Sequence, residues 1–177
     1  MWYDTSTLVT VPAAPAPPAW DALCAHLAKW YHDFDTEALE VVLSAVAAHY
    51  VKGPEPVSLF VVGPSRTGKS VLVDGLAGLP GTHMKGDITS KAFLSGKKGG
   101  VSLLNSLGPS SILLFKDFTT ILSKRDDDRR EVVAALREIA DGHWTRDTGE
   151  LGSKSWRGKC TIIAGVTEAI DRAWETM

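Results

Sequence analysis

The stretch VSLFVVGPSRTGKS, residues 57–70, decides how this chain folds. Its first six residues, 57–62, are mostly Val, Leu and Phe, the composition of a strand buried in a parallel sheet. A glycine-containing loop follows, and residues 71–79 then carry leucines at the spacing of one helical face, until a Pro-Gly pair at 80–81 ends the helix. The order strand, glycine loop, helix predicts an α/β protein with a parallel sheet.

The loop at 63–70 matches the pattern G-x-x-x-x-G-K-S, which binds phosphate. Glycines let the backbone turn tightly, so that several N–H groups point into one concavity, and the next helix directs its positive end at the same place. We expect Lys69 to reach the β- and γ-phosphates of a nucleotide and Ser70 to hold Mg²⁺. A chance match is the alternative, but it arises in well under ~1% of chains of this length. The predicted phosphate contacts are Gly63, Pro64, Ser65, Arg66, Thr67, Gly68, Lys69, Ser70 and Val71.

Length and composition set limits on the rest of the chain. A chain of 177 residues, 44% of them hydrophobic, is long enough for one domain with a full core. The net charge of −2 gives no overall basic field, so any contact with nucleic acid has to be local. Cys24 and Cys160 lack metal-ligand spacing and are expected to be reduced core thiols. The sequence shows no secretory signal and no membrane-spanning run, which predicts an intracellular protein.

Composition divides the chain into three segments. Residues 1–19 are rich in Pro and Ala and are expected to form a flexible lead, and residues 20–54 carry two helical patterns that we expect to pack on the core. In residues 55–177 strands and helices alternate, which predicts a doubly wound, mainly parallel sheet flanked by helices. The predicted elements are helices at 20–31, 36–50, 101–107, 126–140 and 167–177, strands at 82–85, 112–115 and 160–166, and a hairpin at 144–156.

An acidic residue follows the strand predicted at 112–115. After this strand come Lys116 and Asp117, and the carboxyl ends of strands face the ligand in open α/β sheets. A carboxylate there can hold Mg²⁺ through water, so we interpret Asp117 as a metal-site residue that works with Ser70. A helix cap for the following segment is the alternative interpretation.

From about Val57 to Thr167 the chain resembles the P-loop ATPases of the AAA+/RecA-like (ASCE) group, with Asp117 as the Walker B residue. Within this group it is most similar to ATPases of phages and mobile elements that act in DNA replication, of the helicase or primase-helicase type. The runs that carry the likeness are Lys116-Asp117-Phe118-Thr119, Trp156-Arg157-Gly158-Lys159 and Ala164-Gly165-Val166-Thr167. The resemblance implies ATP and Mg²⁺ as cofactors, DNA as a partner, a homo-oligomer when full length, and the cytoplasm of a bacterium or phage-infected cell.

The resemblance adds two catalytic candidates to Lys69 and Asp117. In such families a polar residue ends the strand after Walker B and senses the γ-phosphate or the attacking water. Thr167 holds that place, and a helix N-cap is its alternative role. RecA-like relatives carry a carboxylate after the strand that follows the P-loop helix. Asp87 lies near that place, although a Gly-Asp pair is also typical of a turn.

Two departures from the family pattern bear on catalysis. AAA+ proteins usually place Glu directly after the Walker B Asp to orient water, whereas this chain has Phe118. The chain also ends soon after Thr167, without the expected last strand, arginine finger or second sensor, so a fragment or truncated product is expected. Turnover needs a water-positioning group and usually a neighbour's arginine, so the sequence predicts ATP binding and leaves hydrolysis open.

Two segments are candidates for contact with DNA. The hairpin region 144–159 interleaves Trp144 and Trp156 with Arg and Lys, which suits base stacking combined with phosphate contacts. Burial of both Trp side chains against the sheet is the alternative, and we favour it. The loop at 96–100, with two lysines between glycines, is the second candidate.

Three functions fit these features. The first is Mg²⁺-dependent ATP hydrolysis coupled to nucleic-acid remodelling or translocation. The second is a nucleotide-gated binding module with little turnover, which the absence of Glu at position 118 favours. The third is a small-molecule or nucleotide kinase, but the chain shows no Arg-rich lid after the strand at 112–115. Besides the resemblance, the lack of an N-K-x-D guanine motif favours ATP over GTP.

Overall fold

The computed structural model describes residues 18–53, 55–93, 102–148, 152–168 and 170. Contacts within the chain define two compact units, Met1–Thr36 and Glu37–Met177. The described part of the first unit is helix α1 (Pro18–Leu27) and the turn after it, where the ring centroids of Tyr31 and Phe34 lie 5.6 Å apart. This helix begins inside the predicted lead and ends before the predicted end at residue 31, because the chain passes into i→i+3 turns after Leu27.

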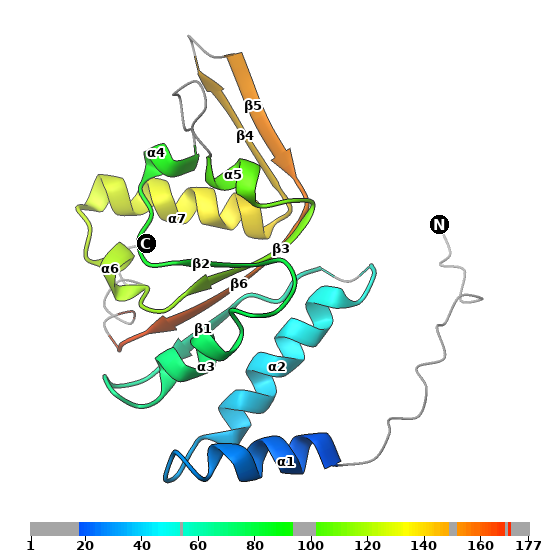
Figure 1. Ribbon diagram of the computed structural model, residues 1–177. Coiled ribbons are helices and arrows are strands. Elements are labelled where there is room, and N and C mark those ends of the chain that lie inside the picture. Colours follow the sequence, from blue (N-terminus) through cyan, green and yellow to red (C-terminus); the bar gives the residue numbers. More distant parts are fainter. Residues whose placement is uncertain (1–17, 54, 94–101, 149–151, 169, 171–177) are drawn as a thin grey trace. The chain divides into compact units, whose positions relative to one another are not determined.

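The second unit is built on a four-stranded sheet in which every pairing is parallel. Its order is β1-β6-β3-β2, so β6 lies between β1 and β3 (Figure 1). The strands are β1 (Leu59–Val62), β2 (Thr82–Lys85), β3 (Ser110–Phe115) and β6 (Lys159–Val166). The predictions of an α/β fold and of a mainly parallel sheet are confirmed, and each predicted strand lies where a strand is found.

The register of the sheet brings the carboxyl ends of its strands to one edge. Val62 at the end of β1 is opposite Val166 at the end of β6. Phe115 at the end of β3 is opposite Ala164 of β6 and Lys85 of β2. The strands run toward the left in Figure 1. The segments that follow the strands therefore leave the sheet at this one edge, where open parallel sheets bind their ligands.

One face of the sheet is covered by α2 (Thr36–Tyr50) and α3 (Lys69–Gly75). Apolar side chains of these two helices form a buried cluster with Ile112 and Leu114 of β3 and Ile163 of β6. α2 thereby packs on the sheet through Val42 and Val46, which belong to this cluster.

The opposite face carries the larger core cluster. Because successive strand residues point to opposite faces, Leu113 and Phe115 of β3 belong to this second cluster. The helices that cover this face are α4 (Ser90–Phe93), α5 (Leu103–Ser106), α6 (Thr119–Leu122) and α7 (Asp126–Ala140). A parallel sheet with helices on both faces is compatible with the predicted doubly wound architecture.

Two helices are shorter than predicted. α3 ends at Gly75 instead of residue 79, because glycine favours helix poorly and residues 76–79 form i→i+3 turns. α5 begins at Leu103 instead of residue 101, because the Ser102 side chain caps it by accepting the N–H of Asn105. The helix predicted from Thr167 onward lies mostly outside the described residues.

The helix predicted at 126–140 and the hairpin predicted at 144–156 are both found. Gly142 ends the helical segment with a φ of 81°, and the hairpin forms from β4 (His143–Thr148) and β5 (Gly152–Arg157), which pair antiparallel.

A buried histidine joins α2 to the sheet. His49 is 3% exposed, its Nδ1 lies 3.0 Å from Thr161 Oγ1, and its Nε2 lies 3.0 Å from Ser110 Oγ. Burial, followed by the Lys159 ammonium, lowers the pKa of His49 below its ordinary value of 6.5. The neutral imidazole is therefore the form that the fold favours.

We expect the folded protein to lose stability as the pH falls below 6.5. The unfolded chain binds a proton at His49 more readily than the folded chain. This contribution is therefore complete above the ordinary pKa and is lost as the pH falls through the lowered one, by at most about 1.4 kcal/mol per pH unit. Urea unfolding between about pH 8 and about pH 5 measures the slope. His49→Gln should show a shallower slope, and equal slopes would assign the effect to another group.

Candidate functional site

The loop between β1 and α3 has the tight backbone that its glycines predict. Arg66 and Gly68 have positive φ angles of 69° and 85°, a conformation that glycine adopts readily and other residues rarely. The Gly63 N–H donates to the Val166 carbonyl at 3.2 Å, so the loop stays tied to the sheet at its first residue. A Cβ on Gly63 would lie 3.3 Å from Thr67 Oγ1, which shows how closely the loop folds on itself.

Lys69 lies against this loop. Its Nζ donates to the carbonyl oxygen of Gly63 at 2.7 Å and also to that of Pro64. In the part of the chain that the structure describes, Lys69 has no carboxylate partner, whereas Lys116 and Lys124 each have one. The Lys69 ammonium is therefore held at the loop with its charge uncompensated by any described carboxylate, an arrangement that suits an anion.

The other predicted phosphate contacts are neighbours of Lys69 in the sequence. Pro64, Ser65, Arg66, Thr67 and Ser70 are exposed, and Gly63, Gly68, Lys69 and Val71 are half-buried. The loop thus presents itself to solvent at the carboxyl edge of the sheet.

Asp117 and Thr167 come to the same edge from neighbouring strands. Asp117 follows β3, is exposed, and accepts the N–H of Thr119 at its Oδ1 (2.9 Å). Thr167 directly follows β6, and its Oγ1 lies 3.3 Å from Thr119 Oγ1. Because β6 lies between β1 and β3, Thr167 leaves the sheet between the Lys69 loop and Asp117. The sheet order thus brings three of the four predicted catalytic residues to adjacent strand ends.

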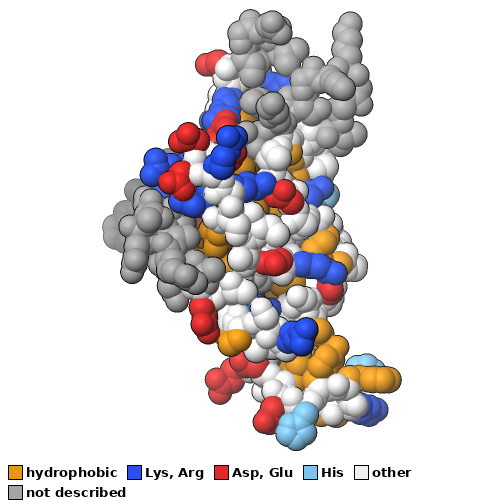
Figure 2. Space-filling model, turned by 90° about the vertical axis from the view of Figure 1, so that its left-hand side faces the viewer, with side chains coloured by type: hydrophobic (Ala, Val, Ile, Leu, Met, Phe, Trp, Pro, Cys, Tyr) orange, Lys and Arg blue, Asp and Glu red, His pale blue; other side chains and the backbone are white. Residues whose placement is uncertain are grey.

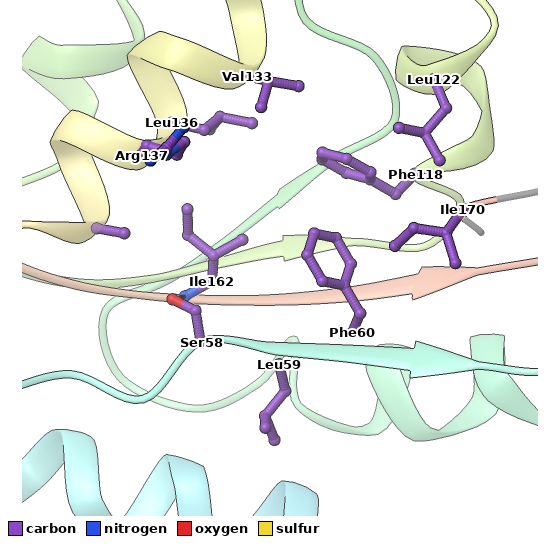
Figure 3. Close-up of a pocket in the computed structure, with 11 residues that line it drawn as sticks. Ser58, Leu59, Phe60, Phe118, Leu122, Val133, Leu136, Arg137, Ile162 and Ile170 are labelled. Carbon is purple, nitrogen blue, oxygen red and sulfur yellow. Dashed lines mark hydrogen bonds between the residues drawn. The ribbon is translucent and has the colours of Figure 1, made fainter. Parts of the chain in front are cut away.

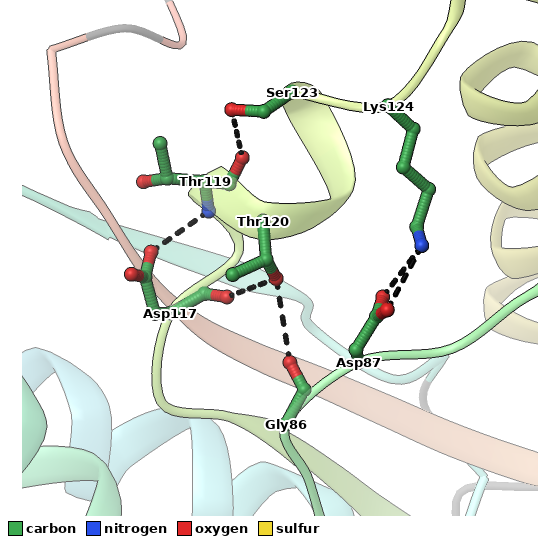
Figure 4. A network of polar contacts seen from close by, with 7 residues as sticks. All are labelled: Gly86, Asp87, Asp117, Thr119, Thr120, Ser123 and Lys124. Atoms are coloured by element: carbon green, nitrogen blue, oxygen red, sulfur yellow. Dashed lines mark hydrogen bonds and ion pairs between the residues drawn. The ribbon is translucent and has the colours of Figure 1, made fainter.

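Asp87 lies at the same edge but at its far end. It follows β2, which is separated from β1 by two strands, a span of about 14 Å at the usual strand spacing. Its carboxylate forms an ion pair with Lys124 at 2.8 Å, and Lys124 is only 17% exposed (Figure 4). Asp87 thus lies beside the segment after β3. Its carboxylate is paired with Lys124, a residue that the sequence did not single out.

A second ion pair escaped the sequence analysis. Lys116 Nζ lies 2.7 Å from the Asp74 Oδ2 of α3, which ties the end of β3 to the helix after the loop. Both side chains are about half exposed, so the pair contributes little stability and acts mainly on orientation. No local sequence pattern predicts the ion pair between Lys116 and Asp74, since the two residues lie far apart in the sequence.

Phe118, at the position where AAA+ proteins carry Glu, turns to the apolar side of the edge. It is 4% exposed, and its ring centroid lies 5.1 Å from that of Phe60 and 5.4 Å from that of Phe115. With Leu136 of α7 it lines an apolar cavity of about 460 Å³ (Figure 3). Asp117 and Phe118 therefore divide the edge, with the carboxylate in solvent and the ring in the core.

The hairpin places its aromatic residues in the core. Trp144 is 1% exposed and stacks with Phe93 at a centroid distance of 6.5 Å. Trp156 is 9% exposed and donates its Nε1–H to the Gly108 carbonyl at 3.2 Å. Burial against the fold, the interpretation that we favoured, is confirmed, and stacking of bases on these two rings is excluded in this conformation.

Two basic residues of the hairpin region, Lys159 and Arg146, are engaged by other groups of the protein. Lys159 belongs to β6, not to the hairpin, and its Nζ donates to the carbonyl oxygens of Ala48 (3.1 Å) and Val51 (2.8 Å). Arg146 forms an ion pair with Glu131. Figure 2 looks onto the carboxyl edge and shows basic and acidic side chains interspersed. The loop at 96–100 lies outside the described residues.

Comparisons of the chain with models of protein families, with curated proteins and with solved structures give no match. Among the described residues, no three His, Cys, Asp or Glu side chains gather into a metal-binding group. None of the described helices has the length and apolar character needed to cross a membrane. Cys24 and Cys160 are free thiols, and burial raises the pKa of Cys160 to about 12, so it supplies no thiolate nucleophile.

Gly165→Ala should destabilise the protein by about 1 to 3 kcal/mol. A Cβ at Gly165 would lie 2.7 Å from the Lys116 carbonyl oxygen and 3.7 Å from the Lys69 Cβ, so the backbone of the site would have to move. Gly75→Ala is the matched control, because a Cβ there meets nothing within 4 Å and alanine favours helix. Urea unfolding compares the two, and equal stabilities would contradict the close approach.

Phe118→Glu should strongly destabilise the protein rather than supply the carboxylate that AAA+ proteins carry at this position. The change removes a buried ring and places a charge among apolar side chains, at a cost of at least about 3 kcal/mol. Phe118→Leu, which keeps the position apolar, should cost less. Urea unfolding gives the stabilities. A stable Glu variant would show that residue 118 can turn toward the polar edge.

Proposed function

We propose that this chain binds ATP with Mg²⁺ at the carboxyl edge of its sheet, hydrolyses the ATP, and couples hydrolysis to remodelling of nucleic acid or translocation along it. The observation that carries the proposal is the Lys69 ammonium, held at a glycine loop without a described carboxylate partner. An ammonium on a loop of backbone amides fits a polyphosphate chain.

Asp117 and Ser70 would hold the metal. Both are exposed at the same edge, and Asp117 keeps one carboxylate oxygen for which no described residue is a partner. Mg²⁺ is commonly bound by one or two protein oxygens together with water and phosphate oxygens, so the residues present fit this ion although no all-protein metal cluster exists among those described. Bound there, Mg²⁺ would neutralise charge on the phosphates.

Two polar residues are candidates for acting on the third phosphate. Thr167 leaves the sheet between the loop and Asp117, a position from which its hydroxyl can donate to a γ-phosphate or to the attacking water. Asp87 is the proposed water-activating carboxylate. Since it is paired with Lys124 and lies at the far end of the edge, this role requires the ion pair to open.

The coupling to nucleic acid follows from the resemblance to phage and mobile-element replication ATPases. The same resemblance supports a homo-oligomer of the full-length protein and a cytoplasmic setting. Since both hairpin Trp rings are buried, contact with DNA would rest on the basic residues of the hairpin and on the loop at 96–100.

A nucleotide-gated binding module with little turnover is the second candidate. Phe118 is buried where a water-orienting Glu would stand, and the Asp87 carboxylate is engaged by Lys124. Both observations favour binding over turnover for the chain by itself.

Steady-state phosphate release from ATP and Mg²⁺ tests the proposal, with and without single-stranded and duplex DNA. We expect release to rise with DNA and to fall at least about tenfold in Lys69→Ala, because the variant loses the charge at the loop. Lys52→Ala, which removes an exposed lysine away from the loop, is the matched control and should behave as the wild type.

Nucleotide binding measured in parallel separates the two candidates. ATP binding that depends on Lys69 without phosphate release, with or without DNA, would favour the binding module. Absence of ATP binding would refute both.

A further inference from the structure

The segment that follows β3, residues 117–124, contacts the residues after both neighbouring strands, β2 and β6, and Figure 4 shows its contacts on the β2 side. Toward β2, the Thr120 hydroxyl lies 3.4 Å from the Gly86 carbonyl oxygen, and Lys124 is paired with Asp87. Toward β6, among the described residues, Thr119 is the one residue of this segment whose side chain makes polar contacts. Of the candidate residues beyond the loop, Asp117 therefore belongs to this segment, and Asp87 and Thr167 contact it.

Thr119 uses all of its polar groups. Its N–H donates to Asp117 Oδ1 at 2.9 Å, and its carbonyl accepts the N–H and the hydroxyl of Ser123 at 2.9 and 2.8 Å. Its Oγ1 lies 3.3 Å from Thr167 Oγ1 and accepts the Thr167 N–H at 3.4 Å. The hydrogen bonds to Ser123 fix the turn that contains Thr119. The other contacts of Thr119 reach Asp117 on one side and Thr167 on the other, so Thr119 connects the two.

We propose that Thr119 is a positioning residue that couples the Asp117 carboxylate to the Thr167 hydroxyl, an inference that rests on the proposed nucleotide site. The Thr119 N–H fixes the orientation of the carboxylate, and its hydroxyl fixes the orientation of Thr167. The metal side and the γ-phosphate side of the site then respond together to the third phosphate. The loop at 63–70 would hold the phosphate chain through Lys69, and no polar contact among the described residues joins this loop to Thr119.

A positioning role and a merely structural role of Thr119 predict different changes in nucleotide affinity. Removing the Thr119 hydroxyl should weaken binding of a triphosphate and leave binding of a diphosphate unchanged. A general loss of fold would weaken both. The measured quantity is the ratio of the dissociation constants of ADP and of a non-hydrolysable ATP analogue, each with Mg²⁺, on the full chain.

Thr119→Val should lower this preference for the triphosphate by about 3- to 10-fold, the value of one hydrogen bond. Thr167→Val should lower it by at least this factor, because it also removes the proposed donor to the γ-phosphate. The double variant should lose no more than Thr167→Val alone, because Thr119 acts through Thr167. Thr119→Ser keeps the hydroxyl and should restore most of the preference. Thr120→Val, whose hydroxyl contacts only backbone carbonyls, is the matched control and should leave the preference within about twofold.

Losses that multiply in the double variant would overturn the inference, as would equal weakening of ADP and of the triphosphate analogue in Thr119→Val. Those outcomes leave the proposed function intact, because the wild type still binds nucleotide through Lys69. A wild-type chain that binds neither nucleotide would overturn the proposed function, and the inference with it.

Discussion

The hydrogen bonds at the end of β6 are the constraint on which the site depends. The carbonyl of Val166 accepts the N–H of Gly63, and the carbonyl of Gly165 accepts the N–H of Phe118 at 2.8 Å. The loops after β1 and β3 are therefore anchored on two consecutive residues of the strand between them. Gly165 permits this approach, since a Cβ at this residue would lie only 2.7 Å from the Lys116 carbonyl oxygen. A change in the position of β6 would move the loop at 63–70 and the Asp117 carboxylate together.

Polarity divides along the same edge. Consecutive residues after β3 turn in opposite directions, so that Asp117 stands in solvent while Phe118 joins Phe60 and Phe115 in the apolar cluster. Burial of this ring and exposure of the carboxylate are coupled by the backbone that joins them. The fold therefore gains apolar contact at residue 118, where a charged side chain would be costly to bury.

The lysines at this edge of the sheet differ in whether a carboxylate pairs with them. Lys116 is paired with Asp74 and Lys124 with Asp87, whereas Lys69, within the described part of the chain, donates only to oxygens of its own loop. Among the described residues, the Lys69 ammonium without a carboxylate partner and the Asp117 carboxylate without a cationic partner thus lie after β1 and β3, on either side of β6. An anion attracted by the first and a cation attracted by the second would meet above β6, where Thr167 leaves the sheet.

The sequence alone determined the parallel α/β fold and the glycine loop, because both depend on local patterns: apolar runs of strand length, leucines at helical spacing, and glycine where φ is positive at residue 68. It also placed Asp117 and Thr167 at strand ends. Only the tertiary structure decided the strand order that puts Thr167 between the loop and Asp117, the pairing of Asp87 with Lys124, and the burial of Trp144 and Trp156. These features arise from contacts between distant residues, and an ion pair or a buried ring leaves no periodic trace in the chain.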